Sequence, residues 1–263
     1  MPPIVVYHHN CHDGITALWV ALRKWPDAEP YAGRYEAPPE LEKLAGRDVV
    51  VVDFSWKRPA LERVRSVVAS LLVIDHHKTA RDDLAGMPGC VFDMERSGAG
   101  LTWDTLFPGE PRPPLVNYTE DRDLWRFALP QSREVHAAVN CYPLTIEVRS
   151  DLMARSIDDL AAEGVAVLRY HDKIVASAAK HVRREMIGGV EVPSVACPVI
   201  EIVSDLGHVL AKGEPFSATY CDRADGSRVY SLRSTDDGMD VSEIAKQYGG
   251  GGHKHAAGFT RTS

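Results

Sequence analysis

Histidine and aspartate residues follow three apolar segments in the first third of the sequence, and these residue types bind divalent metal ions. Residues 8–13 follow the apolar segment 4–7, Asp53 follows 49–52, and residues 75–77 follow 71–74. Carboxylates that converge without a cation repel one another and raise their pKa values, and a pair of divalent ions removes this repulsion. Mixed His and Asp ligands suit Mn²⁺, Fe or Zn²⁺ better than Ca²⁺. The pattern therefore predicts a two-metal site.

Each of these clusters has a simpler explanation when it is taken alone. A single Asp after a strand is most often a turn former or a helix cap, and a lone His is most often a structural residue. Three such clusters, each directly after a buried strand, favour the metal site. A fourth acidic cluster at 118–125 is weak by itself, but it is a further source of carboxylate ligands.

The elements that must position these residues alternate between strands and helices. Four consecutive β-branched residues at 49–52 are typical of a parallel strand that is covered on both faces. Further strands are predicted at 4–7, 71–74 and 90–92, with helices at 14–24 and 59–70. This alternation predicts right-handed βαβ units and an α/β fold with a doubly wound, mainly parallel sheet. Because the carboxyl ends of such strands line the ligand crevice, we expect all three clusters at one edge of the sheet.

The rest of the chain is divided by a proline-rich loop at 107–114 and a glycine break at 187–189. Helices are predicted between them at 157–170 and 172–184. Beyond the break, strands are predicted at 190–196, 216–222 and 228–233, with helices near 204–212 and 240–248. We therefore expect a metal-binding catalytic domain at 1–135, a helical connector at 136–187, and a smaller α/β domain with a mixed sheet at 188–263.

Four consecutive glycines at 249–252 are costly in chain entropy and therefore need an explanation. A flexible linker is one interpretation, but the segment lies close to the C-terminus, and small residues follow it. A loop of this kind can direct backbone N–H groups at a phosphate or a carboxylate, and we favour that interpretation. The predicted substrate-binding residues are Arg233, Ser234, Gly250, Gly251, Gly252, His253 and His255.

Two motifs in this order resemble those of a known family. The segment 74–77, Ile-Asp-His-His, looks like the signature of the DHH phosphoesterases, and 249–258 looks like the GGGH motif of their associated C-terminal domain. The chain is most similar to the compact nanoRNases and 3′-phosphoadenosine-5′-phosphate phosphatases, particularly a short branch with an N-terminal HxNCxDG pattern. From its length we expect no additional nucleic-acid-binding domain like that of RecJ-type exonucleases, and its C-terminal glycine motif distinguishes it from the family II pyrophosphatases, whose second domain differs.

The resemblance implies roles for individual residues. Asp53 would bridge two divalent ions, for which Mn²⁺ is preferred and Mg²⁺, Fe or Zn²⁺ are alternatives. The catalytic residues would be His77, which contacts phosphate or transfers a proton, and Asp75, which orients its neighbours. Asp121 matches the fourth acidic motif best, with Asp123 as the alternative. The implied metal ligands are His8, Asp13, Asp53, His76 and Asp121.

One departure from the family pattern concerns the first motif. Cys11 stands where the first aspartate of a D-x-D pair is expected, and a thiolate is a softer ligand that changes metal preference or weakens one site. His9 or His12 could compensate. The departure leaves open which of the three binds metal.

The expected function is metal-dependent hydrolysis of short nucleotide phosphoesters, such as short oligonucleotides, 3′-phosphoadenosine-5′-phosphate (pAp) or dinucleotides. The alternatives are a single-strand-specific RecJ-like exonuclease and a nucleotide-binding module with a degenerate metal site. The net charge of −7 argues against a broad basic face for long duplex nucleic acid. Residues 188–263 carry 7 Lys and Arg against 10 Asp and Glu, so no basic stripe is expected there either.

The same composition bears on location. No apolar run approaches the ~18 residues of a membrane helix, and the first residues lack the features of a signal peptide. The 5 cysteines are scattered without a CxxC pair, which suits a reducing compartment. We expect a cytoplasmic protein without membrane partners, and a homodimer stays open.

Overall fold

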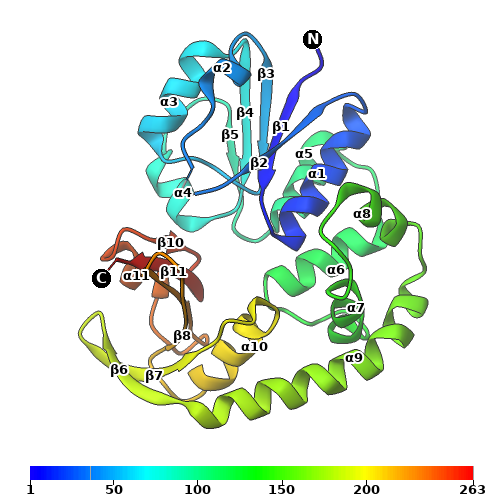
Figure 1. The fold of residues 1–263 in the computed structure, drawn as a ribbon. Coiled ribbons are helices and arrows are strands. Elements are labelled where there is room, and N and C mark those ends of the chain that lie inside the picture. The colour runs from blue at the N-terminus through cyan, green and yellow to red at the C-terminus, as the bar shows by residue number, and fades with distance from the viewer. Residues whose placement is uncertain (36, 263) are drawn as a thin grey trace. The chain divides into compact units, whose positions relative to one another are not determined.

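The computed structural model describes residues 1–35 and 37–262. The chain folds into two compact units, Met1–Val167 (unit 1) and Leu168–Ser263 (unit 2) (Figure 1). The division falls inside the helical connector expected at 136–187. It lies within one long helix, α9 (Ile157–Ala178), where two helices at 157–170 and 172–184 were expected. The second of these expectations is wrong at its end, because residues 183 and 184 belong to a strand.

Unit 1 contains a five-stranded sheet in the order β2-β1-β3-β4-β5, and every pair of neighbours is parallel. This confirms the predicted α/β fold with a parallel sheet. The chain passes from β1 outward to β2 and returns to β3 on the other side of β1. The order in which strands are added to the sheet therefore reverses between β1 and β3. Ligands bind at such a switch point in open α/β sheets. The strands are β1 (Ile4–His8), β2 (Glu29–Gly33), β3 (Asp48–Val52), β4 (Ser70–Asp75) and β5 (Cys90–Phe92).

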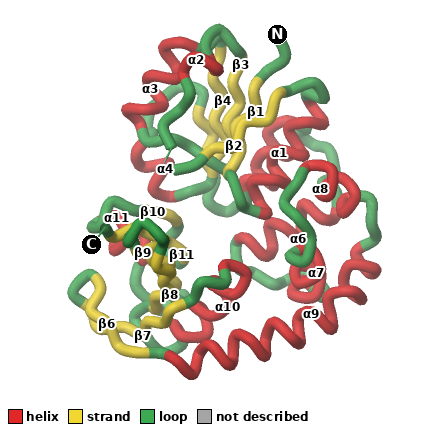
Figure 2. The backbone as a smooth tube through the Cα atoms, in the orientation of Figure 1, coloured by secondary structure: helices red, strands yellow, loops and turns green. Residues whose placement is uncertain are grey.

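Helices cover both faces of this sheet, which explains the run of valines in β3. Val50 and Val52 pack with α1 (His12–Lys24) and α5 (Gly98–Leu106) in one apolar cluster. Val49 and Val51 face the opposite cluster, to which the second helical layer contributes. Because side chains alternate along a strand, a strand covered on both faces is apolar at every position. The second layer consists of α2 (Leu41–Leu44), α3 (Arg58–Val67) and α4 (Lys78–Asp83) (Figure 2).

A small helical subcluster completes unit 1. Its core joins Leu115, Val135, Leu152 and Leu160 from four successive helices. Beside α9, these helices are α6 (Pro114–Asp123), α7 (Ser132–Val139) and α8 (Ile146–Met153). No described helix is both long and apolar enough to cross a membrane.

Unit 2 contains a six-stranded sheet in the order β10-β11-β9-β8-β7-β6, with one parallel pair, β7 and β8, among antiparallel pairs. This confirms the expected mixed sheet. Helix α10 (Ile200–Ala211) packs with Val195, and α11 (Val241–Lys246) packs in a separate cluster with Val192. The strands are β6 (Arg183–Ile187), β7 (Val190–Ala196), β8 (Ser217–Asp222), β9 (Arg228–Arg233), β10 (Gly251–Gly252) and β11 (Ala256–Arg261).

Candidate active site

Asp53 lies at the switch point of the unit 1 sheet, directly after β3. Its backbone adopts the left-handed region with φ 53°, and its amide donates to the carbonyl of Ile74 on neighbouring β4, 2.9 Å away. A non-glycine residue in this region is strained by about 1–3 kcal/mol, and such residues cluster at functional sites. The local fold therefore holds this carboxylate at the edge of the sheet against a backbone preference.

Histidines on both neighbouring strands contact the Asp53 carboxylate, which is buried. His76, after β4, hydrogen-bonds Asp53 Oδ1 through Nε2 at 3.1 Å, and His8, at the end of β1, places Nδ1 3.4 Å from Oδ2. Burial alone would raise the pKa of Asp53, but the hydrogen bond with His76 and the nearby His8 outweigh it and hold the pKa well below its usual value. Burial would lower the pKa of His76, but the hydrogen bond with Asp53 and the charges of Asp123, Asp53 and Asp13 raise it well above its usual value.

Two further carboxylates approach the same imidazole. His76 Nε2 lies 3.6 Å from Asp13 Oδ2 on α1 and 3.6 Å from Asp123 Oδ2 at the end of α6. Burial, followed by repulsion from Asp53 and Asp123, raises the pKa of Asp13 well above its usual value. The convergence of carboxylates predicted from the sequence is therefore present. We refer to His8, Asp13, Asp53, His76 and Asp123 as the metal cluster.

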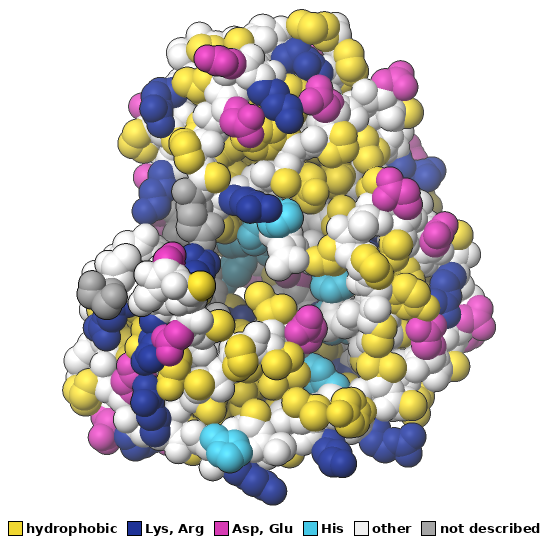
Figure 3. Space-filling model, viewed as in Figure 1, with side chains coloured by type: hydrophobic (Ala, Val, Ile, Leu, Met, Phe, Trp, Pro, Cys, Tyr) yellow, Lys and Arg dark blue, Asp and Glu magenta, His cyan; other side chains and the backbone are white. Residues whose placement is uncertain are grey.

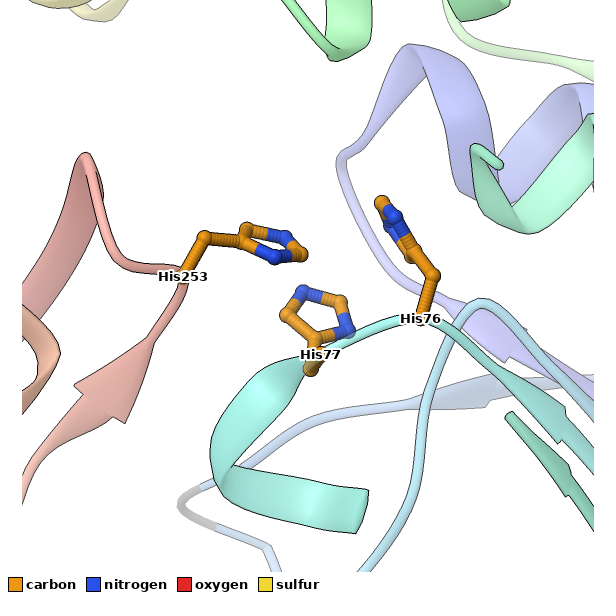
Figure 4. Close-up of side chains that lie close together, drawn as sticks. All are labelled: His76, His77 and His253. Atoms are coloured by element: carbon orange, nitrogen blue, oxygen red, sulfur yellow. The ribbon is translucent and has the colours of Figure 1, made fainter. Parts of the chain in front are cut away.

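Asp75 and His77 form a pair beside this cluster. Asp75 is fully buried, and its Oδ1 lies 2.7 Å from His77 Nδ1 and accepts the His76 amide at 2.8 Å. The rings of His76 and His77 are 4.9 Å apart and follow β4 directly, whereas His253 comes from the segment after β10 (Figure 4). Burial would raise the pKa of Asp75, but the charge of His77 and its hydrogen bond lower it. Asp75 thus fixes the orientation of His77.

Asp121 and Asp123, the two candidates for the fourth acidic ligand, are placed differently. The buried Asp121 carboxylate accepts the amides of Ala128 and Leu129 at 2.9 and 3.2 Å, and it thereby anchors the chain after α6. The Asp123 side chain, which is 27% exposed, contacts His76 instead. Residues two apart on a helix point in different directions. The structure therefore brings Asp123, and not the first choice Asp121, to the metal cluster.

The N-terminus of α5 belongs to the site and was not anticipated from the sequence. The amides of Gly98 and Ala99 both donate to the Asp13 carboxylate, as expected for an anion at the positive end of a helix. A Cβ atom at Gly98 would lie 2.4 Å from Asp53 Cβ, so only glycine fits beside the metal cluster. The Ser-Gly-Ala-Gly run at 97–100, with Ser97 as the helix cap, was the available signal.

The donor set fits divalent metal ions. Among the described residues of unit 1, three groups of donors have ligand atoms within 4.8 Å of one another, and two of the groups share Asp53. His8 Nδ1, Asp53 Oδ2 and Asp75 Oδ2 are buried and have no hydrogen-bond partner among the described residues. Unsatisfied buried polar atoms of this kind point to a bound ion or water. The three groups are His8-Cys11-Asp53, Asp13-His76-Asp123 and Asp53-Asp75-His77.

His9 and His12, the two candidates to compensate for Cys11, bind arginines instead. His9 Nε2 accepts from Arg34 at 3.0 Å, and His12 Nδ1 accepts from Arg149 at 2.9 Å. Burial, Arg149 and Arg122 lower the pKa of His12 to about 3. Arg149 is itself almost fully buried, and burial lowers its pKa to about 10. No pattern in the sequence marked this arginine.

In unit 2, the predicted substrate-binding side chains divide into two arrangements. Ser234 Oγ and His255 Nδ1 are hydrogen-bonded at 3.0 Å, and the Ser234 amide donates to the carbonyl of His255. The guanidinium of Arg233 donates to Ser204 Oγ on α10 at 2.8 Å. The structure therefore brings Ser234 and His255 together and directs Arg233 to a helix.

The glycine segment, residues 249–258, is a β-hairpin within this sheet. Gly251 pairs with Gly258 in the ladder between β10 and β11, and the His253 amide donates to the carbonyl of Ala256 across the turn. A Cβ atom at Gly250 would lie 2.0 Å from the carbonyl oxygen of Gly258, and Gly252 has φ 139°. Close backbone packing therefore requires these glycines, whether or not a ligand binds there.

No protein-family model matches the chain. An uncharacterized protein, R106, of Acanthamoeba polyphaga mimivirus is 30% identical over 280 residues, which cover 97% of this chain and 66% of that protein. Oligoribonuclease NrnB of Bacillus subtilis (strain 168) is 46% identical over 59 residues, covering 22% of this chain and 15% of NrnB. The chain thus spans less than two thirds of either relative.

Solved structures with the same fold are more distant in sequence. RecJ of Thermus thermophilus, solved with Mn²⁺, has a TM-score of 0.58 at 15% identity, covering 98% of this chain and 49% of RecJ. The DHH domain of a member of the s1p family of ribosomal proteins has a TM-score of 0.58 at 16% identity, covering 97% and 82%. PggH of Vibrio cholerae, a pGpG-specific phosphodiesterase, has a TM-score of 0.52 at 14% identity, covering 99% and 93%.

Proposed function

We propose that the chain is a DHH-family phosphoesterase, specifically a metal-dependent hydrolase of short nucleotide phosphoesters. The observation that carries this proposal is Asp53, a buried carboxylate held in a strained backbone conformation and shared between His76, 3.1 Å from Oδ1, and His8, 3.4 Å from Oδ2. A carboxylate shared in this way is what a two-metal centre requires. Such centres hydrolyse phosphoesters by activating water and by neutralising the phosphoryl oxygens.

The metal cluster would hold the two ions. Asp53 would be their common ligand, His8 would serve one ion, and the Asp13, His76 and Asp123 group would serve the other. Asp123 replaces Asp121 in this assignment because Asp121 is bonded to backbone amides. Mn²⁺ is the preferred ion, since carboxylate-rich sites suit it and RecJ was solved with Mn²⁺.

His77 is proposed to act on the substrate from beside the cluster. Its Nδ1 is bonded to Asp75, and we assign to the second ring nitrogen, Nε2, the contact with a phosphoryl oxygen or the protonation of the leaving oxygen. The fixed tautomer is the contribution of Asp75. Both roles belong to this chain's own residues and do not depend on the identity of the metal.

A short nucleotide is the proposed substrate, and unit 2 is proposed to recognise it. NrnB is an oligoribonuclease and PggH is specific for pGpG, so both names indicate short substrates. The Ser234 and His255 pair offers a hydroxyl and an imidazole at the end of β9. We keep short oligonucleotides, pAp and dinucleotides as the candidates.

Two alternatives are less well supported. A single-strand exonuclease like RecJ would need a long basic track, whereas acidic and basic side chains both occur across the face shown in Figure 3, and residues 188–263 carry more acids than bases. A binding module with a degenerate metal site is disfavoured because the described donor atoms still lie within 4.8 Å of one another, close enough to bind a common ion.

The cytoplasmic assignment stays part of the proposal. All 5 cysteines are free thiols, as expected for a protein of a reducing compartment.

The test is hydrolysis of pAp, the dinucleotide pApA and single-stranded DNA by the whole chain with Mn²⁺. We expect turnover of one of the two short substrates, and Asp53→Asn should lower kcat by more than a thousandfold while the protein remains folded. Asp48→Asn is the matched control, because Asp48 lies at the opposite, exposed end of β3 and should tolerate the change. Preference for long DNA, or near-wild-type activity of Asp53→Asn, would contradict the proposal.

A further inference from the structure

Cys11 occupies the position directly before α1, between two elements that deliver metal ligands. It is the N-terminal cap residue of that helix, with an extended backbone, and its carbonyl accepts the amide of Ile15 at 3.0 Å. A capping side chain usually bonds an amide of the first helical turn, whereas Cys11 makes no side-chain cap hydrogen bond. Cysteine is also not among the residues that are preferred as helix caps, so capping does not explain the choice of a thiol here.

The Cys11 sulfur lies in a compact group with His8 and Asp53. One donor atom of each of the three residues lies within 4.8 Å of the other two. In this group His8 Nδ1 and Asp53 Oδ2 are 3.4 Å apart, and both are buried without a hydrogen-bond partner among the described residues. Buried polar atoms without a hydrogen-bond partner are rare in folded proteins, so the group is arranged to receive a ligand.

The neighbouring histidines do not compete for this position. His9 is bonded to Arg34 and His12 to Arg149, and neither histidine belongs to a donor group in the described part of the chain. Cys11 is thus the third donor to which the geometry points.

We propose that Cys11 is a thiolate ligand of one of the two metal ions, together with His8 and Asp53, and that this site prefers Zn²⁺, Co²⁺ or Fe²⁺ over Mn²⁺ and Mg²⁺. The inference rests on the proposed two-metal function and specifies the metal at one of its sites. When the metal–sulfur bond forms, the thiol gives its proton to solvent, and no oxidation state changes.

The two donor groups then differ in chemistry. One supplies nitrogen, sulfur and oxygen, and the other, Asp13, His76 and Asp123, supplies one nitrogen and two carboxylates. Thiolate and imidazole select zinc-like ions, while carboxylates suit Mn²⁺ and Mg²⁺. The centre is therefore expected to take two different metals when both are offered.

The experiment titrates the metal-free whole chain with Co²⁺ and records the ultraviolet absorption. A thiolate bound to cobalt gives a sulfur-to-metal charge-transfer band, which we expect in the wild type and not in Cys11→Ser. Cys141→Ser is the matched control and should keep the band, because Cys141 is an exposed thiol of unit 1 and belongs to no donor group of the described residues. A band that survives Cys11→Ser, or that is absent from the wild type, overturns the proposal.

X-ray absorption of the zinc-loaded chain gives a second readout, with one sulfur expected at about 2.3 Å from zinc. Cys11→Asp guards against a variant that simply fails to fold. It should still bind metal, lose the sulfur signal, and shift its relative affinity from Zn²⁺ toward Mn²⁺ by at least about tenfold. Equal affinity ratios in wild type and Cys11→Asp would overturn the proposal.

These readouts are independent of turnover. Hydrolysis of pApA with Mn²⁺ but no sulfur band would support the proposed function and exclude Cys11 as a metal ligand. A Cys11-dependent band without hydrolysis of any tested substrate would support Cys11 as a metal ligand and contradict the proposed function.

Discussion

Three side-chain atoms at the carboxyl edge of the unit 1 sheet, His8 Nδ1, Asp53 Oδ2 and Asp75 Oδ2, are buried without a hydrogen-bond partner among the described residues, whereas the backbone of the glycine segment in unit 2 is paired with itself. At the sheet edge, carboxylates crowd around His76, and Asp53 adopts a strained backbone. In the glycine segment, the backbone is paired in a hairpin, and Ser234 and His255 are hydrogen-bonded. Both regions carried motifs in the sequence, yet within the described part of the chain only the first of the two holds buried side-chain atoms without a hydrogen-bond partner.

The sheet edge and the glycine segment therefore have distinctive sequences for different reasons. The sheet edge accepts electrostatic repulsion and strain, which a bound cation can relieve. Gly250 and Gly252 instead allow two strands to approach, so the fold alone accounts for these two glycines. We therefore expect metal to act mainly on unit 1 and the glycine substitutions to act mainly on stability.

Metal removal should give the largest effect. Chelation with EDTA is expected to abolish hydrolysis, and Mn²⁺ at 100 times its Kd should restore it and stabilise the protein by about 2.7 kcal/mol. Hydrogen exchange should show new protection at the ends of β1, β3 and β4, where the unsatisfied donors lie. If Mn²⁺ protected residues 249–258 and left these strand ends unchanged, the result would contradict the expectation that metal acts mainly on unit 1.

Substitution of Gly250 should test the structural role of the glycine segment. We expect Gly250→Val to destabilise unit 2 by roughly 3 kcal/mol, because the new side chain meets the carbonyl of Gly258. Gly249→Ala is the matched control: its φ is 79° and nothing lies within 4 Å of its Cβ, so only backbone strain of about 1 kcal/mol is added. Urea unfolding measures both, and equal effects would show that close packing is not the cause.

The part of the fold that the sequence could predict is the set of strands marked by continuous apolar runs. The valine run of β3 and the apolar segments of β1 and β4 indicated their strands and the edge where Asp53, Asp75 and His76 meet. β2 was missed, since Pro30 weakens the pattern, although an edge strand tolerates proline. β10 and β11 were missed because glycines in a hairpin look like those of a loop.

The choice between Asp121 and Asp123 could not be made from sequence. Both residues lie on α6, and which one faces the metal cluster depends on how that helix is rotated against α1 and α5. The contribution of Gly98 was hidden for a similar reason. It depends on the approach of α5 to Asp53, a contact between residues far apart in the chain.

The smallest expected effect concerns recognition by unit 2. Ser234→Ala removes the hydrogen bond that orients His255, and a bond of this kind contributes about 1 kcal/mol, or roughly fivefold in KM. We expect this increase for pApA and a smaller one for bis(p-nitrophenyl) phosphate, which lacks a nucleoside for the pair to recognise. Ser231→Ala is the matched control, because it removes a hydroxyl from β9, the strand that ends directly before Ser234, at a position paired with Gly258. Equal increases for both substrates would mean that the pair supports the fold of unit 2, and the glycine segment and its neighbours would then have no role in recognition.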